Sequence, residues 1–156
     1  MTGPGTVTPA VNAGEAFANS SGLVNTASTS TDDTVTFDNI APTVTINQAT
    51  GQADPTDVSP IHFTVVFSKP VTGFVTGDVT LSGTAGATTA TVTGGPTTYD
   101  VAVSGMAQSG TVIASIATGK AADLAGNPNT ASTSTDNSVT FSITALKKRR
   151  GQITSQ

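Results

Sequence analysis

The chain of 156 residues contains no cysteine and no tryptophan, and it has no long hydrophobic run. Without cysteine, the protein forms no disulfide and has no thiolate for catalysis or for binding a metal. No apolar stretch approaches the roughly 18 residues that a membrane-spanning helix requires. We therefore expect no membrane span and no disulfide framework.

Charged and aromatic residues are also scarce, at 10% and 4% of the chain. Disordered segments are rich in Lys, Glu and Pro, so the low charge argues against disorder. Thr and Val are abundant, and their β-branched side chains favour half-buried strands. The 16 glycines and 8 prolines separate short strands from one another. The composition predicts an all-β fold.

The charges are distributed unevenly. Four of the six basic residues stand together as KKRR at positions 147–150, which leaves the rest of the chain with two bases against ten acids. A basic run can bind nucleic acid or anionic lipid. This one lies outside the strand pattern and has no aromatic neighbours, which favours a solvated tail. We therefore expect no nucleic-acid partner, and the role of the tail stays open.

One phrase occurs twice in the sequence. NTASTSTDDTVTF at residues 25–37 returns as NTASTSTDNSVTF at residues 129–141, and the match extends back to Gly5 and Gly110. The spacing is 105 residues at its start and 104 at its end, so the first copy carries one extra residue. Such a period is too long for the rung of a solenoid and suits a tandem array of β-sandwich domains.

The repeat predicts three parts in the chain. Residues 1–38 are expected to be the C-terminal part of a preceding, incomplete repeat, because they lack opening strands of their own. Residues 39–143 are expected to form one complete repeat, and residues 144–156 a basic C-terminal tail. On this interpretation the chain is a piece of a longer array.

The complete repeat contains seven runs with the alternation of strands. In PIHFTVVF, residues 60–67, Ile, Phe, Val and Phe share one face while His62 points to the other. Phe63, Val101 and Phe141 are predicted core residues, whereas the pattern assigns Phe74 and Phe17 to neither face. The seven predicted strands are PTVTI, PIHFTVVF, DVTLSG, ATVTGG, TTYDVAVSG, GTVIASI and SVTFSI, and VTGFV is an eighth candidate.

Several motifs together resemble a known family. APTVTI, SPIHFTVVFSKPVTGF, GDVTLSGTAG, TYDVAVSGM and SGTVIASIATGKAADLAGNPNTASTSTDNSVTF are similar to the bacterial Ig-like repeats of large secreted or surface proteins. The resemblance implies an Ig-like antiparallel β-sandwich of seven to eight strands, strung in tandem. It also implies an extracellular or cell-surface location and an adhesin-type parent protein. Lys69 departs from the pattern, in which an acidic residue is more usual.

The sequence offers little catalytic chemistry. His62 is the single histidine, and a lone imidazole without cysteine is a poor metal site or general base. No GxSxG turn accompanies the many serines, and a serine nucleophile needs a positioned base. The aspartates fall at turns and strand starts, where they cap backbone amides. We therefore expect no enzyme activity.

Calcium is the cofactor for which the sequence offers ligands, because loop carboxylates and carbonyls suit a hard cation. Loops at the same end of a sandwich could bring such oxygens together and stiffen the joint between repeats. The alternative is that these residues cap turns and supply solubilising charge, and none of the loops has a dense calcium-binding pattern. The candidate ligands are Asp38, Asp54, Asp57, Asp123, Asn127 and Asp136.

Three functions remain open at this point. The repeat and the short junction DNIA after Phe37 favour a structural spacer whose partners are neighbouring Ig-like repeats. An adhesive module for a carbohydrate or protein would need exposed aromatic side chains, of which the chain has few. A filament subunit would exchange the unpaired strands of residues 5–38 with a neighbour. In the spacer interpretation, other parts of the protein would contact host or matrix ligands.

Overall fold

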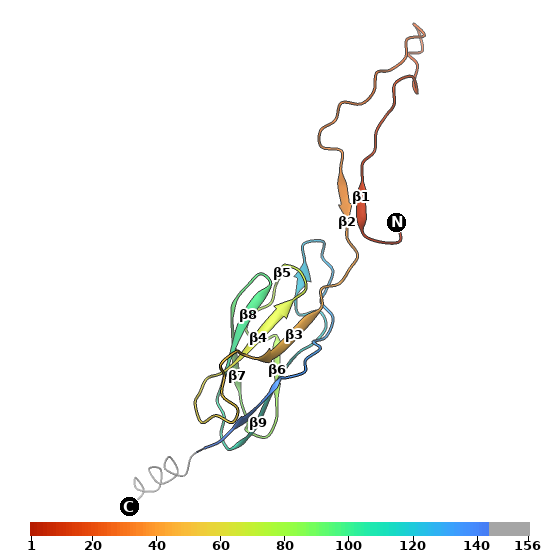
Figure 1. Ribbon diagram of the computed structural model, residues 1–156. Helices are drawn as coiled ribbons and strands as arrows, with labels where there is room; N and C mark the ends of the chain where they lie inside the picture. Colours follow the sequence, from red (N-terminus) through yellow and green to blue (C-terminus); the bar gives the residue numbers. More distant parts are fainter. Residues whose placement is uncertain (144–156) are drawn as a thin grey trace, which may run out of the picture. The chain divides into compact units, whose positions relative to one another are not determined.

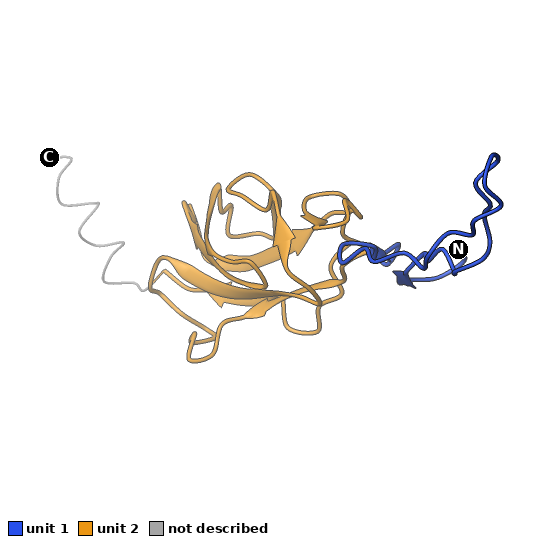
Figure 2. Cartoon of the chain, turned by 90° about the horizontal axis from the view of Figure 1, so that it is seen from above, with its two compact units in different colours: residues 1–40 blue, residues 41–156 orange. Residues whose placement is uncertain are grey.

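The computed structural model describes residues 1–143, and the predicted basic tail lies outside them. The chain divides into two compact units, Met1–Ile40 and Ala41–Gln156, called unit 1 and unit 2 below (Figure 2). The described residues contain strands, turns and loops and no helix. None of them forms an apolar helix long enough to cross a membrane.

Unit 2 consists of two antiparallel sheets and a small two-stranded ribbon (Figure 1). One sheet has the order β3-β4-β8-β7, the other the order β11-β9-β6, and β10 pairs with β5. These are the two sheets and the strand order of an immunoglobulin sandwich. The strands are β3 (Val44–Gln48), β4 (Ile61–Phe67), β5 (Val71–Thr72), β6 (Val79–Ser82), β7 (Thr89–Gly94), β8 (Thr98–Ser104), β9 (Gly110–Ile116), β10 (Ala122–Asp123) and β11 (Ser138–Phe141).

Alternation along the strands builds the core between the two sheets. In β4 the side chains of Ile61, Phe63, Val65 and Phe67 are at most 2% exposed, while the residues between them face outward. Val101 of β8 and Phe141 of β11 are buried in the same cluster. The predicted all-β sandwich and these core positions are confirmed. Successive side chains of a strand point to opposite faces, so the apolar residues at every second position all face the core.

Phe74 lies in the core, although it belongs to a loop. Its ring packs edge-to-face on Phe67 and Tyr99, with centroids 5.3 and 5.1 Å apart, and the residue is 4% exposed. The Tyr99 hydroxyl donates to the Val71 carbonyl at 3.4 Å, and burial raises the pKa of this phenol. The exposed aromatic patch that would favour adhesion is therefore not formed by Phe74.

The stretch before β11 runs along the outer edge of β3. The N–H groups of Thr130 and Thr133 donate to the carbonyls of Pro42 and Val44, and Gln48 N–H donates to the Asp136 carbonyl. The partners advance in the same direction along both segments, so the stretch lies parallel to β3. Further on, Thr56 and Phe141 form a parallel bridge. These bonds occupy an edge that would otherwise be open to another chain.

Unit 1 contains one antiparallel pair of strands, β1 (Gly5–Val7) and β2 (Val35–Phe37), at the base of a long loop (Figure 1). Within that loop, Phe17 and Val24 form an isolated antiparallel bridge. Phe17 is 70% exposed, and Val35 is 66% exposed. Two short strands bury too little apolar surface to form a core. The origin of residues 1–38 in a preceding repeat stays a prediction here.

Candidate functional site

Asp123, in β10, is a buried acidic side chain with several hydrogen-bond donors around it. It is 6% exposed, and Lys69 Nζ lies 3.0 Å from its Oδ2. The backbone N–H groups of Ala125 and Asn127 donate to Oδ1 at 3.0 and 2.9 Å. The Asn127 amide adds donors at 3.1 and 3.2 Å. The sequence prediction of a loop here missed β10, whose two residues pair with Thr72 and Val71 of β5.

These donors keep Asp123 ionised. Burial alone would raise the pKa of its carboxyl, but hydrogen bonds from Asn127 and the charge and hydrogen bond of Lys69 outweigh it. The net effect lowers the pKa from 3.8 to about 2. Lys69, the residue that departs from the family pattern, therefore supplies the counter-charge of a buried carboxylate. The cluster fastens the turn after β10 to the segment after β4.

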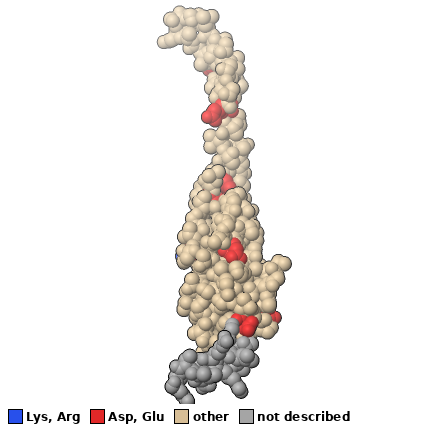
Figure 3. All heavy atoms as spheres, turned by 90° about the vertical axis from the view of Figure 1, so that its left-hand side faces the viewer, with Lys and Arg blue, Asp and Glu red and all other residues tan. Residues whose placement is uncertain are grey.

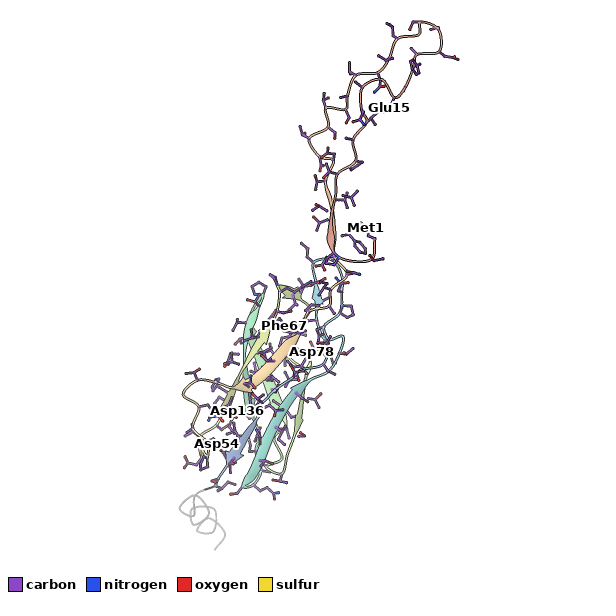
Figure 4. All side chains as sticks on the ribbon, turned by 45° about the vertical axis from the view of Figure 1, so that its right-hand side comes forward. Met1, Glu15, Asp54, Phe67, Asp78 and Asp136 are labelled. Atoms are coloured by element: carbon purple, nitrogen blue, oxygen red, sulfur yellow. The ribbon has the colours of Figure 1, made fainter. Side chains whose placement is uncertain are left out.

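Asp54, Asp57 and Asp136 belong to other parts of unit 2. Asp54 Oδ1 accepts the Thr140 N–H of β11 at 2.9 Å, so its loop adjoins the end of that strand (Figure 4). Asp136 accepts the Gln48 N–H through its backbone carbonyl at 2.6 Å. Asp54 and Asp57 precede β4, whereas Asp123 faces the segment that follows β4. The seven residues of β4 span about 20 Å.

The five candidate calcium ligands that belong to unit 2 therefore do not form one site there. Asp136 adjoins Gln48 at the end of β3 from which the Asp54 loop leaves, whereas β4 separates this end from the Asp123 turn, so the expected loops share one end only in part. Asp38 belongs to unit 1 and accepts the Ile40 N–H at 2.9 Å. Among residues 1–143, no group of three or more His, Cys, Asp or Glu could hold a metal ion. Calcium binding stays a prediction, while Asp38, Asp54 and Asp123 each cap a backbone amide.

His62 has a partner that the sequence did not reveal. Its Nδ1 lies 3.0 Å from both carboxylate oxygens of Asp100 on β8, and the two side chains are 42% and 44% exposed. They border a shallow depression of about 350 Å³ with Ala49, Thr50, Gly51 and Gln52. One imidazole and one carboxylate supply two parts of a hydrolytic triad, and the third part, a nucleophile, is not among their hydrogen-bond partners in the described residues.

Asn129 is the second residue whose role the sequence did not show. It is 1% exposed, and Oδ1 accepts the backbone N–H groups of Lys120 and Ala121 at 2.7 and 2.8 Å. Its amide group donates to the carbonyls of Ala117 and Thr130 at 3.0 and 2.7 Å. One side chain thereby closes the loop from Ala117 to Thr130. The sequence did mark this residue, because the repeated phrase begins at Asn129.

A groove lies between the edge strands β6 and β7, where the two sheets part. It has a volume of about 400 Å³, and its walls combine apolar and hydroxyl side chains. Val79, Leu81 and Ala90 are half-buried there and pack against the core. The lining residues are Thr76, Gly77, Val79, Leu81, Ala87, Thr88, Thr89 and Ala90.

Two sheets with this strand order and one shared core define an immunoglobulin-like β-sandwich. Residues 38–143 match the bacterial Ig-like domain family, and the chain belongs to that family. A solved structure, the N-terminal part of the bacterial S-layer protein SbsC, is 17% identical with a TM-score of 0.40. The similarity covers 66% of this chain and 24% of that one, so this chain spans about a quarter of its length. A comparison with curated proteins gives no match.

Proposed function

We propose that the chain is a non-catalytic spacer module of a tandem-repeat protein at the bacterial cell surface or outside the cell. The observation that carries the proposal is the repeated segment, which forms the same strand pair in both units, Gly5 with Phe37 and Gly110 with Phe141. Repetition of one folding unit lengthens a protein without adding chemistry. Membership of a bacterial Ig-like domain family fits a structural, non-enzymatic module.

The junction between the units supports a spacer. Only residues 38–43 separate β2 from β3, and they include no glycine. Asp38 caps the Ile40 amide, and Pro42 is fully buried. Proline fixes one backbone dihedral, so the junction has less freedom than a Gly/Ser linker.

The surface supports the same proposal. Figure 3 shows acidic side chains in small, separate groups among uncharged residues on one face. On this face the acidic side chains do not gather into one charged patch. The His62–Asp100 pair is half-exposed and has no hydrogen-bonded nucleophile among the described residues, which argues against hydrolysis.

The test measures the freedom of the junction. Spin labels are attached at Ser21→Cys in unit 1 and Ser59→Cys in unit 2, two exposed positions. We expect a narrower distribution of label-to-label distances for the natural junction than for a variant with six Gly/Ser residues inserted after Asn39. Equal widths would remove the support for a spacer. Light scattering at tens of micromolar should show a monomer.

A second candidate, an adhesive module for a protein ligand, is favoured by the groove between β6 and β7. Leu81 and Val79 are apolar and half-buried in it, so a peptide segment could cover them. Immobilised chain is exposed to extracellular-matrix proteins, with the Leu81→Asp variant as the control. Saturable binding that this variant abolishes would favour adhesion over a spacer role.

A further inference from the structure

Units 1 and 2 share more than a stretch of sequence. Their strand pairs have the same register, since Gly5, Thr6 and Val7 face Phe37, Thr36 and Val35. In unit 2, Gly110, Thr111 and Val112 face Phe141, Thr140 and Val139. The matched residues are thus paired identically at every position of β1 and β2.

The loops between the strands also share their hydrogen bonds. Asn25 repeats three side-chain bonds of Asn129, with Ala16 N–H as donor and the carbonyls of Asn12 and Thr26 as acceptors. Ser28 and Val11 exchange the same two bonds as Ser132 and Ile116. The Phe17–Val24 bridge corresponds to the bridge between Ala122 and Pro128. Unit 1 therefore shares the strand register and the loop hydrogen bonds of the closing half of unit 2, although β1 has three residues where β9 has seven.

The two units differ in burial. Val112 and Val139 are 0% exposed in unit 2, where they belong to the core shared with β3, β4 and β8. Their counterparts Val7 and Val35 are 43% and 66% exposed. Phe37 is 37% exposed, against 8% for Phe141. The apolar face of β1 and β2 has the pattern of a core surface and lacks the opposite sheet.

The loop of unit 1 differs less clearly. Phe17, Leu23 and Val24 are between 53% and 70% exposed. Of their counterparts in unit 2, Ala122 and Asn127 are half-buried and Pro128 is exposed. This turn of unit 2 includes β10, which pairs with β5 of the opening half. An opening half would therefore meet both the strand pair and the loop.

We propose that unit 1 is the closing half of a second Ig-like domain, and that its apolar face docks the opening strands of a repeat like residues 41–109. The occupant is placed in the same polypeptide, ahead of Gly5, as residues 41–109 stand ahead of Gly110. A second copy of this chain is a poor source of opening strands, because its own opening strands already cover Val112 and Val139 in the core of unit 2. The inference concerns the folding of unit 1 and does not rest on the spacer function.

The experiment supplies the opening half. A second copy of residues 41–109 is placed directly before Gly5 in the otherwise full chain. Lys69→Ala is introduced in the added copy, because Ala18 stands in unit 1 where Asp123 would bind the lysine. A second version also carries Phe17→Ala, which places in unit 1 the alanine found at the matched position, Ala122. This version allows for the case in which the larger ring of Phe17 does not fit against the added half.

Amide hydrogen exchange of Val7 and Val35 is compared between the extended chains and the chain of 156 residues. We expect exchange at least about 100-fold slower in an extended chain, because covered strands open with the whole domain. Val35→Asp in the extended chain should abolish this protection and leave unit 2 unaffected. Chymotrypsin cleavage after Phe17 or Leu23 should fall in parallel in the version that retains Phe17.

Two results would overturn the inference. One is equal exchange of β1 and β2 in the chain of 156 residues and in both extended versions. The other is slow exchange in the unextended chain together with a dimer in light scattering, which would make a second copy the occupant.

Discussion

The closing segments of units 1 and 2 have the same register and the same asparagine-centred loop, yet one is exposed and the other buried. The hydrogen bonds of Asn25 and Asn129 lie within the segment itself, so they require no other strand. Burial of Val139 requires the opposite sheet. The comparison teaches that the hydrogen-bonded backbone of this segment depends on local partners, whereas burial of its apolar face depends on strands from elsewhere.

The two copies diverge in the turn between the bridge residues. Asp123 and Asn127 of unit 2 correspond to Ala18 and Leu23 of unit 1, as the shared backbone bonds show. The ion pair with Lys69 therefore belongs to one copy alone in the described chain. The backbone bonds of the turn are present in both copies, so the turn does not depend on the ion pair with Lys69.

The largest expected difference comes from the matched phenylalanines. Phe141→Ala should lower the free energy of unfolding of unit 2 by about 3–5 kcal/mol, because it leaves a cavity in the core. Phe37→Ala should change it by less than about 0.5 kcal/mol. Urea unfolding followed by the fluorescence of Tyr99, the single tyrosine, reports on unit 2. Equal losses would mean that Phe37 is buried in solution.

The matched asparagines should differ next. Asn129→Ala leaves buried backbone N–H and carbonyl groups unpaired and should cost about 2–3 kcal/mol. Asn25→Ala removes the same kind of bonds from a loop open to water and should leave the unfolding of unit 2 unchanged. Thermal unfolding by circular dichroism measures both variants. A harmless Asn129→Ala would show that water replaces the lost bonds.

The third prediction concerns calcium binding by the acidic loops of unit 2, whose aspartates cap turns. If the predicted site exists, calcium at ten times its dissociation constant should stabilise the fold by about 1.4 kcal/mol. Melting with calcium and with chelator measures the shift, and Asp54→Ala and Asp123→Ala identify the loop. A midpoint that stays within about a degree would dispose of calcium as a ligand.

The last prediction concerns the dependence of stability on pH. Because the pKa of Asp123 falls from 3.8 to about 2 on folding, its charged form stabilises unit 2 fully above pH 4–5. This contribution should disappear as the pH falls from about 4 towards 2. Asp123→Asn should flatten the stability curve in that window, measured by urea unfolding at each pH. Ala18→Asp, at the matched place in unit 1, should leave the curve of unit 2 unchanged.

Much of the fold of unit 2 was predictable because its strands alternate strictly. The period of two in PIHFTVVF was enough to assign Phe63 to the core. Phe74 could not be assigned, since a loop residue has no such period and its burial depends on Phe67 and Tyr99. β10 was missed because two residues are too few for any pattern.

The side-chain partners were less predictable than the strands. His62 meets Asp100, and Lys69 meets Asp123, only through the register of strands far apart in sequence. The sequence does not show at which end of the sandwich each acidic loop lies. The expectation that these loops share one end therefore had no structural constraint behind it. By contrast, the repeat located Asn129 at the head of its phrase, although a buried role was not inferred from it.

The stretch of residues 130–136 that runs parallel to β3 has a mechanical consequence. Unit 2 is entered through β3 and left through β11, so tension applied to its two ends pulls these neighbouring segments in opposite directions along their length. The bonds of Pro42, Val44 and Gln48 then carry the load together and must rupture as a group. An antiparallel terminal pair would peel open one bond at a time. The arrangement of unit 2 thus loads these backbone bonds in shear when its two ends are pulled apart.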